Sequence, residues 1–163
     1  MIMKRRHFLI GLTGFAAGCR SLASPMATAE STSVIDVFDP RMRELVDPSA
    51  VLLERASGFT WSEGPAWDPV RSRLYFSDVP ENKAWMWSEA GGLELFLSPS
   101  GAADLAGFRE PGSNGLLYAN DGALLVCNHG RRCVERLDIE TKARTVVAGE
   151  YEGKPFNSPN DVI

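Results

Sequence analysis

The feature that most constrains the fold is a pattern of four short apolar segments that occurs twice in this 163-residue chain. The first occurrence covers residues 65–97 and the second covers residues 116–148, and turn residues such as Gly, Asp, Asn and Pro separate the segments. Equivalent positions, such as Leu74 and Leu124, lie about 50 residues apart, with no helical period between the segments. A four-stranded unit at this period is typical of a β-propeller blade, because a single blade leaves a sheet face that only a neighbouring blade buries.

A third unit begins at residues 158–163, where the sequence ends within its first predicted strand. Two blades and the start of a third cannot close a ring, since a ring of six such units needs roughly 300 residues. We therefore predict an all-β, incomplete β-propeller over residues 58–163. We expect the chain to be a truncated product, the product of a partial gene, or one piece of a longer protein.

Residues 30–57 form a predicted approach segment ahead of the propeller. Asp39 can cap a short helix that begins at Pro40, because an aspartate cap satisfies free backbone N–H groups and a proline fits the first helical position. The Val-Leu-Leu-Glu run at residues 51–54 is the first predicted strand.

Residues 1–29 have the features of an export signal. Lys4, Arg5 and Arg6 precede an apolar run at residues 8–18, which is too short to span a bilayer core of roughly 30 Å. The arginine pair is typical of a twin-arginine signal, so we expect an exported, periplasmic bacterial protein. An Ala-x-Ala cleavage site at residues 27–29 favours a soluble mature protein, whereas acylation of Cys19, in a lipobox-like sequence, would give a membrane-anchored lipoprotein.

The charge of the chain argues against nucleic acid as a partner. The formal net charge is -4, and the leader contributes four basic residues and no acid, so the remainder carries about -8 (-4 minus 4). Nucleic-acid binding needs clustered Lys and Arg, and the only adjacent pair outside the leader is Arg131 with Arg132. We expect no nucleic-acid partner, and a membrane partner only if Cys19 is lipidated.

Two cysteines, Cys127 and Cys133, lie on either side of a predicted hairpin centred on Gly130. We expect them to face each other across the two strands, where Cβ atoms are about 4.5–5.5 Å apart, slightly long for a disulfide. An exported protein can form disulfides. The pair is therefore either a disulfide or two buried or half-buried thiols.

Three polar residues occupy the same place at the start of successive units: Glu63, Asn114 and Asn160. In a propeller the first strand of every blade lines the central channel, so equivalent positions converge near the axis. A carboxylate and amide oxygens that meet there would suit Ca²⁺ or Mg²⁺, which prefer hard oxygen ligands. The simpler interpretation is that each residue stabilises a turn.

Four segments are distinctive in combination: Trp-Ser-Glu-Gly-Pro-Ala-Trp at 61–67, Leu-Tyr-Phe-Ser-Asp at 74–78, Cys-Asn-His-Gly-Arg-Arg at 127–132 and Gly-Lys-Pro-Phe-Asn-Ser-Pro-Asn-Asp-Val at 153–162. Together they resemble the N-terminal portion of the SMP-30/gluconolactonase/LRE-like family of sugar lactone lactonases, from about Phe38 to the last residue. The resemblance implies a six-bladed propeller with one divalent cation at the channel mouth. Ca²⁺ is the first choice, with Mg²⁺, Zn²⁺ or Mn²⁺ as alternatives.

The resemblance also implies roles for residues that match the family's motifs. Glu63 and Asn160 match metal ligands. The family's catalytic Asp, which acts as general base, belongs to later blades and would lie beyond Ile163. Asn114 is expected to contact substrate in the channel.

Two further residues near these positions are candidates for substrate binding. His129 follows Asn128, a position where relatives often carry Glu, and is either a substrate-binding or proton-carrying residue or an ordinary turn histidine. Trp61, two residues before Glu63, is expected to form a wall of the pocket. A Ser-His-Asp triad is not predicted, because the sequence contains no Gly-x-Ser-x-Gly elbow.

These expectations define one function and two alternatives. The first is metal-assisted hydrolysis of a sugar lactone or related cyclic ester, in which the cation polarises the carbonyl and a carboxylate takes a proton from water. The second is hydrolysis of an aryl ester or phosphotriester at the same cation, and the third is a calcium-binding or partner-binding propeller without enzymatic activity. Because the base would lie beyond Ile163, we expect the chain by itself to be nearly inactive.

Overall fold

The computed structural model describes residues 35–104, 107 and 109–163. The predicted leader at 1–29, its Cys19 and the start of the approach segment at 30–34 lie outside these residues. The chain forms two units, Met1–Leu53 and Glu54–Ile163, and each is described by itself. No helix in the described ranges is long and apolar enough to cross a membrane.

In its described part the first unit contains one short 3-10 helix, η1 (Pro40–Glu44). The Asp39 side chain caps this helix by accepting a hydrogen bond from the Arg41 backbone N–H at 2.9 Å, and Pro40 is the first helical residue. The predicted cap is confirmed. The strand expected at residues 51–54 is wrong, because these residues pair with none of the strands that the structure describes.

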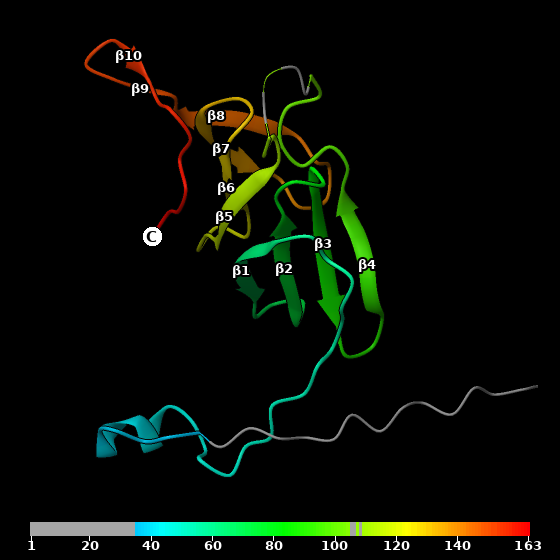
Figure 1. Cartoon of the computed structure of the whole chain (residues 1–163), viewed down its shortest axis with the longest axis vertical. Coiled ribbons are helices and arrows are strands. Elements are labelled where there is room, and N and C mark those ends of the chain that lie inside the picture. Colours follow the sequence, from blue (N-terminus) through cyan, green and yellow to red (C-terminus); the bar gives the residue numbers. More distant parts are fainter. Residues whose placement is uncertain (1–34, 105–106, 108) are drawn as a thin grey trace, which may run out of the picture. The chain divides into compact units, whose positions relative to one another are not determined.

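Two four-stranded antiparallel sheets form the body of the second unit (Figure 1). The first consists of β1 (Ser62–Asp68), β2 (Arg73–Asp78), β3 (Lys83–Ser88) and β4 (Gly92–Leu97), and the second of β5 (Ser113–Tyr118), β6 (Leu124–Asn128), β7 (Cys133–Leu137) and β8 (Arg144–Ala148). Within each sheet every strand pairs with the next one in the chain. A hairpin of β9 (Glu150–Tyr151) and β10 (Lys154–Pro155) follows. The predicted all-β, incomplete propeller is confirmed, with a strand at each apolar segment of the two repeats.

The two sheets pack against each other around one apolar core. Tyr75 pairs with Met86 across β2 and β3, and Leu124 pairs with Leu137 across β6 and β7. All four side chains are buried. Side chains alternate between the two faces of a strand, so each sheet contributes every second residue to this core. The sheets are therefore two blades that bury each other's faces.

The first strands of the two blades approach each other backbone to backbone. A Cβ atom on Gly64, whose φ is +58°, would lie 2.3 Å from the Asn114 carbonyl oxygen, which leaves no room for a side chain. A Cβ atom on Gly115 would lie 2.7 Å from the Asn160 carbonyl oxygen, to which the Gly115 amide donates a hydrogen bond at 2.9 Å. β1, β5 and the chain at Asn160 therefore lie side by side, in the order that the repeat predicts.

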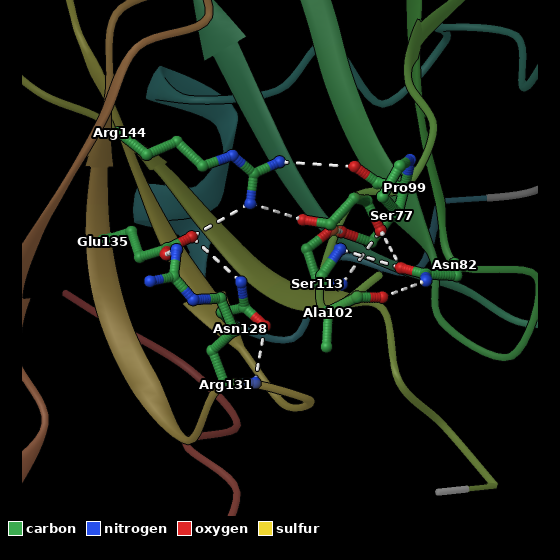
Figure 2. Close-up of polar contacts among 11 residues, drawn as sticks. Ser77, Asn82, Pro99, Ala102, Ser113, Asn128, Arg131, Glu135 and Arg144 are labelled. Atoms are coloured by element: carbon green, nitrogen blue, oxygen red, sulfur yellow. Dashed lines mark hydrogen bonds and ion pairs between the residues drawn. The ribbon is translucent and has the colours of Figure 1, made fainter. Parts of the chain in front are cut away.

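A buried polar network joins the second blade to the segment between the blades (Figure 2). Glu135 on β7 is fully buried, and its carboxylate accepts hydrogen bonds from Asn128 Nδ2 and Arg144 Nη1, both at 2.9 Å, and from Arg131. The Arg144 guanidinium also donates to the Ser100 carbonyl oxygen at 2.8 Å. The two cations and the amide compensate the loss of water around the carboxylate. Arg144 consequently ties β8 to the connection between the blades.

Cys127 and Cys133 are both free, buried cysteines, so the thiol alternative is confirmed. The expectation that they face each other is wrong: Cys127 pairs with Val134, and Cys133 pairs with Asn128. A shift of one residue turns a side chain to the other face of a sheet, so the two sulfur atoms lie on opposite faces. Burial raises the pKa of the Cys127 thiol to about 11.

We predict that alkylation of the folded chain at about pH 8 leaves Cys127 unlabelled, because a buried thiol with a pKa of about 11 is almost entirely protonated and shielded from the reagent. After unfolding without reductant, Cys127 and Cys133 should both carry the label, as measured by peptide mass spectrometry. A peptide that joins Cys127 to Cys133 in the unreduced sample would contradict the strand register.

Arg144→Met should lower the free energy of unfolding by about 3 kcal/mol, because the buried Glu135 carboxylate loses one of its two cations. Urea unfolding followed by circular dichroism measures the change. Arg136→Met is the matched control: Arg136 lies 2.7 Å from Asp121 in a pair whose side chains are 42% and 57% exposed, and its loss should cost less than about 1 kcal/mol. Equal decreases in the free energy of unfolding of the two variants would show that the buried network does not anchor the second blade.

Candidate metal and substrate site

The strand that opens each blade contains a β-bulge at the position of a predicted site residue. The pairing of β1 with β2 shifts register between Glu63 and Ala66, and the pairing of β5 with β6 shifts between Ser113 and Leu116. Glu63 therefore stands at the edge of the first bulge, and Asn114 lies within the second. A bulge bends a strand and re-aims its side chains, so the regular alternation of the sheet does not dictate where these two residues project.

Asn114 lies at the centre of a hydrogen-bonded group with His129 and Asn160. Asn114 Nδ2 donates to Asn160 Oδ1 at 3.0 Å and lies 3.2 Å from His129 Nε2. Asn114 is 2% exposed and His129 is 6% exposed, whereas Asn160 lies at the surface. Because an amide nitrogen only donates, His129 Nε2 is the acceptor of this hydrogen bond.

Backbone contacts hold this group in place. The Ser77 hydroxyl on β2 donates to the Asn114 carbonyl oxygen at 2.8 Å, and the Ser77 and Ser113 hydroxyl oxygens lie 2.7 Å apart. The His129 amide donates to the Gly112 carbonyl oxygen at 3.2 Å. His129 therefore begins the turn between β6 and β7 while its side chain is buried against Asn114.

Trp61 and Glu63 form the second part of the site. Trp61 Nε1 donates to Glu63 Oε1 at 3.1 Å. Glu63 is half-buried, and Trp61 is 42% exposed. The Trp61 backbone amide donates to Asp78 Oδ1 at 3.0 Å, so the end of β2 fixes the backbone that carries the indole.

The five predicted site residues form two hydrogen-bonded groups, Trp61 with Glu63 and Asn114 with His129 and Asn160. The contact between Gly64 and the Asn114 backbone places the groups on adjacent strands. The sequence prediction did not include Ser77 and Asp78, which hold the two groups from β2. The sequence feature that could have identified Ser77 and Asp78 is a Ser-Asp pair at the end of β2, the strand that follows β1.

The donor atoms of the site fit a hard cation better than a soft one. Glu63 supplies a carboxylate, and Asn160 Oδ1 keeps a second lone pair beside the one that accepts from Asn114. Oxygen ligands of this kind suit Ca²⁺ or Mg²⁺. Across the residues with described coordinates, no group of three or more His, Cys, Asp and Glu side chains could hold a metal ion. A cation at Glu63 and Asn160 would therefore need further oxygen ligands to complete its coordination.

Comparison with known proteins finds gluconolactonases. The gluconolactonase of Zymomonas mobilis is 38% identical over 154 residues, which cover 93% of this chain and 43% of that protein. The chain thus spans less than half the length of this relative.

Solved structures give the same result. An X-ray structure from structural genomics, of a protein assigned as a gluconolactonase, is 40% identical with a TM-score of 0.57, over 66% of this chain and 34% of that one. The gluconolactonase from Xanthomonas campestris is 33% identical with a TM-score of 0.52, over 63% of this chain and 31% of that one.

A family model also matches. The model described as the SMP-30/Gluconolactonase/LRE-like region covers residues 61–163, a range that includes all five predicted site residues. Sequence, blade architecture and relatives therefore agree, and the chain belongs to the SMP-30/gluconolactonase/LRE-like family.

Proposed function

We propose that this chain forms part of a metal-dependent hydrolase that opens a small-molecule sugar lactone or related cyclic ester. The observation that carries the proposal is the placement of Glu63 on β1, Asn114 on the adjacent β5 and Asn160 on the segment beside β5, at equivalent positions of successive repeats. Similar proteins from Zymomonas mobilis and Xanthomonas campestris are gluconolactonases. Because the chain spans 43% of the former, the activity is proposed for a whole protein of that kind.

Glu63 and Asn160 would hold one divalent cation, with Ca²⁺ as the first choice and Mg²⁺, Zn²⁺ or Mn²⁺ as alternatives. When bound, the cation would polarise the lactone carbonyl and stabilise the negative charge that develops on its oxygen. The hydrogen-bond donor of Glu63 is the neutral indole of Trp61, so this contact brings no positive charge that would compete with the cation.

The remaining residues would position the substrate. Asn114 uses its Nδ2 group toward Asn160 and His129, which leaves its Oδ1 for a substrate hydroxyl. His129 Nε2 is engaged with Asn114 Nδ2, so His129 would act on the substrate mainly through the amide that it orients. The exposed part of the Trp61 ring would form an aromatic wall against the ring of the substrate.

The general base is proposed to be a carboxylate beyond Ile163, which would take the proton from the attacking water. In this proposal the chain supplies binding and orientation, and the later carboxylate takes the proton. The twin-arginine-like leader supports export of the protein to the periplasm.

Glu63→Gln should weaken Ca²⁺ binding by at least about tenfold, because it removes the negative charge that faces the cation and preserves the size of the side chain. Isothermal titration calorimetry of the 163-residue chain measures the affinity. Glu94→Gln on β4 is the matched control, because Glu94 is exposed and lies in the fourth strand of the first blade. Unchanged affinity in Glu63→Gln would contradict the assignment of Glu63 as a ligand.

We expect the chain by itself to hydrolyse gluconolactone at nearly the uncatalysed rate with Ca²⁺ present, because the proposed base lies beyond Ile163. A pH-stat assay measures the acid released. Turnover that is abolished by a chelator and by Glu63→Gln would show instead that the base lies within residues 1–163.

A longer chain that contains the expected Asp separates the alternative functions. Aryl-ester or phosphotriester hydrolysis without lactonase activity would favour the alternative substrate class, and the absence of all three activities would favour a non-enzymatic propeller.

A further inference from the structure

Trp61 is held by both its backbone and its side chain. The Asp78 carboxylate accepts hydrogen bonds from the Thr60 amide at 3.2 Å and the Trp61 amide at 3.0 Å, and the Val79 amide donates to the Trp61 carbonyl oxygen at 3.2 Å. Asp78 is 2% exposed, so this clamp lies inside the blade. The backbone that carries the indole is therefore held independently of the contacts that the Trp61 side chain makes.

From this fixed backbone, the indole N–H of Trp61 contacts the carboxylate of Glu63. Trp61 Nε1 donates to Glu63 Oε1 at 3.1 Å, while 42% of the Trp61 surface stays exposed. A residue that served only as an aromatic wall would not need its N–H directed at the carboxylate. Glu63 in turn stands at the edge of a bulge, where the sheet does not fix its side chain.

The chemistry of the donor matters as much as its position. In the described ranges no lysine or arginine pairs with Glu63, and the indole is its hydrogen-bond donor. A cationic partner would orient the carboxylate but would also cancel the charge that attracts a metal ion. A neutral N–H restricts the side chain and leaves the negative charge available.

We infer that Trp61 is a positioning residue for cation binding, whose indole N–H holds the Glu63 carboxylate ready to receive the ion. This inference rests on the proposed metal site and deepens it. Hydrogen-bond partners of metal-binding carboxylates commonly change metal affinity by about 10–100-fold when they are removed.

Trp61→Phe tests the inference, because it keeps an aromatic ring and removes the N–H group. Trp67→Phe on β1 is the matched control, since Trp67 is 51% exposed and lies at the other end of the strand. Calorimetry should show Ca²⁺ affinity about tenfold weaker in Trp61→Phe and within about twofold of wild type in Trp67→Phe. The urea midpoints of the two variants should be alike.

A second measurement follows the indole N–H of Trp61 in samples that keep this residue. The chain has four tryptophans, so its ¹H–¹⁵N spectrum contains four indole signals, and the one that disappears in Trp61→Phe belongs to Trp61. This signal should move in Glu63→Gln and on addition of Ca²⁺, while the Trp67 signal stays in place. If Trp61→Phe does not fold, this measurement decides, with the Trp61 signal assigned by ¹⁵N-labelled triple-resonance experiments.

The possible outcomes separate this inference from the metal site itself. Wild-type Ca²⁺ affinity in Trp61→Phe, together with lost affinity in Glu63→Gln, overturns the positioning role and leaves the metal site standing. A Trp61 indole signal that does not move in Glu63→Gln or on addition of Ca²⁺ also overturns the positioning role. If the wild-type chain binds no Ca²⁺ at millimolar concentration, where water can complete the coordination, the metal site fails and the inference fails with it.

Discussion

The close contact between the first strands of successive blades is the constraint on which the rest of the structure depends. Gly64 lies against the Asn114 backbone, and Gly115 lies against the Asn160 backbone, at distances that exclude any side chain. This contact brings equivalent positions of successive repeats onto neighbouring strands. The bulges at the same positions then release Glu63 and Asn114 from the regular sheet geometry, so that packing between blades and the chemistry of the site share one structural cause.

Two kinds of polar contact accompany this packing. Glu135 is fully buried, and two arginines and an amide satisfy its carboxylate, so it serves to fasten the blade. Glu63 is half-buried, and among the residues that the structure describes its hydrogen-bond donor is the neutral indole of Trp61, so no paired cation there competes with a metal ion. The difference between a structural and a binding carboxylate is visible here in the partners rather than in the residue type.

Local patterns were sufficient to predict the eight strands of the two blades, because apolar alternation and turn residues are encoded within each segment. They could not predict the cysteine register, since a hairpin that shifts by one residue turns Cys133 to the other face. The run at residues 51–54 has strand-like composition but pairs with none of the described strands, which composition does not reveal. The Trp61–Glu63 hydrogen bond depends on the bulge and on Asp78, so it is a property of the tertiary structure.

The chain at Asn160 docks on β5 through a backbone hydrogen bond, although residues 156–163 form no strand of their own. The start of a third repeat therefore finds its place on the second without a sheet around it. In such an architecture a finished blade can act as the template on which the next one is laid down. Folding could accordingly advance in the direction of synthesis, with each newly made segment adding to a surface that already exists.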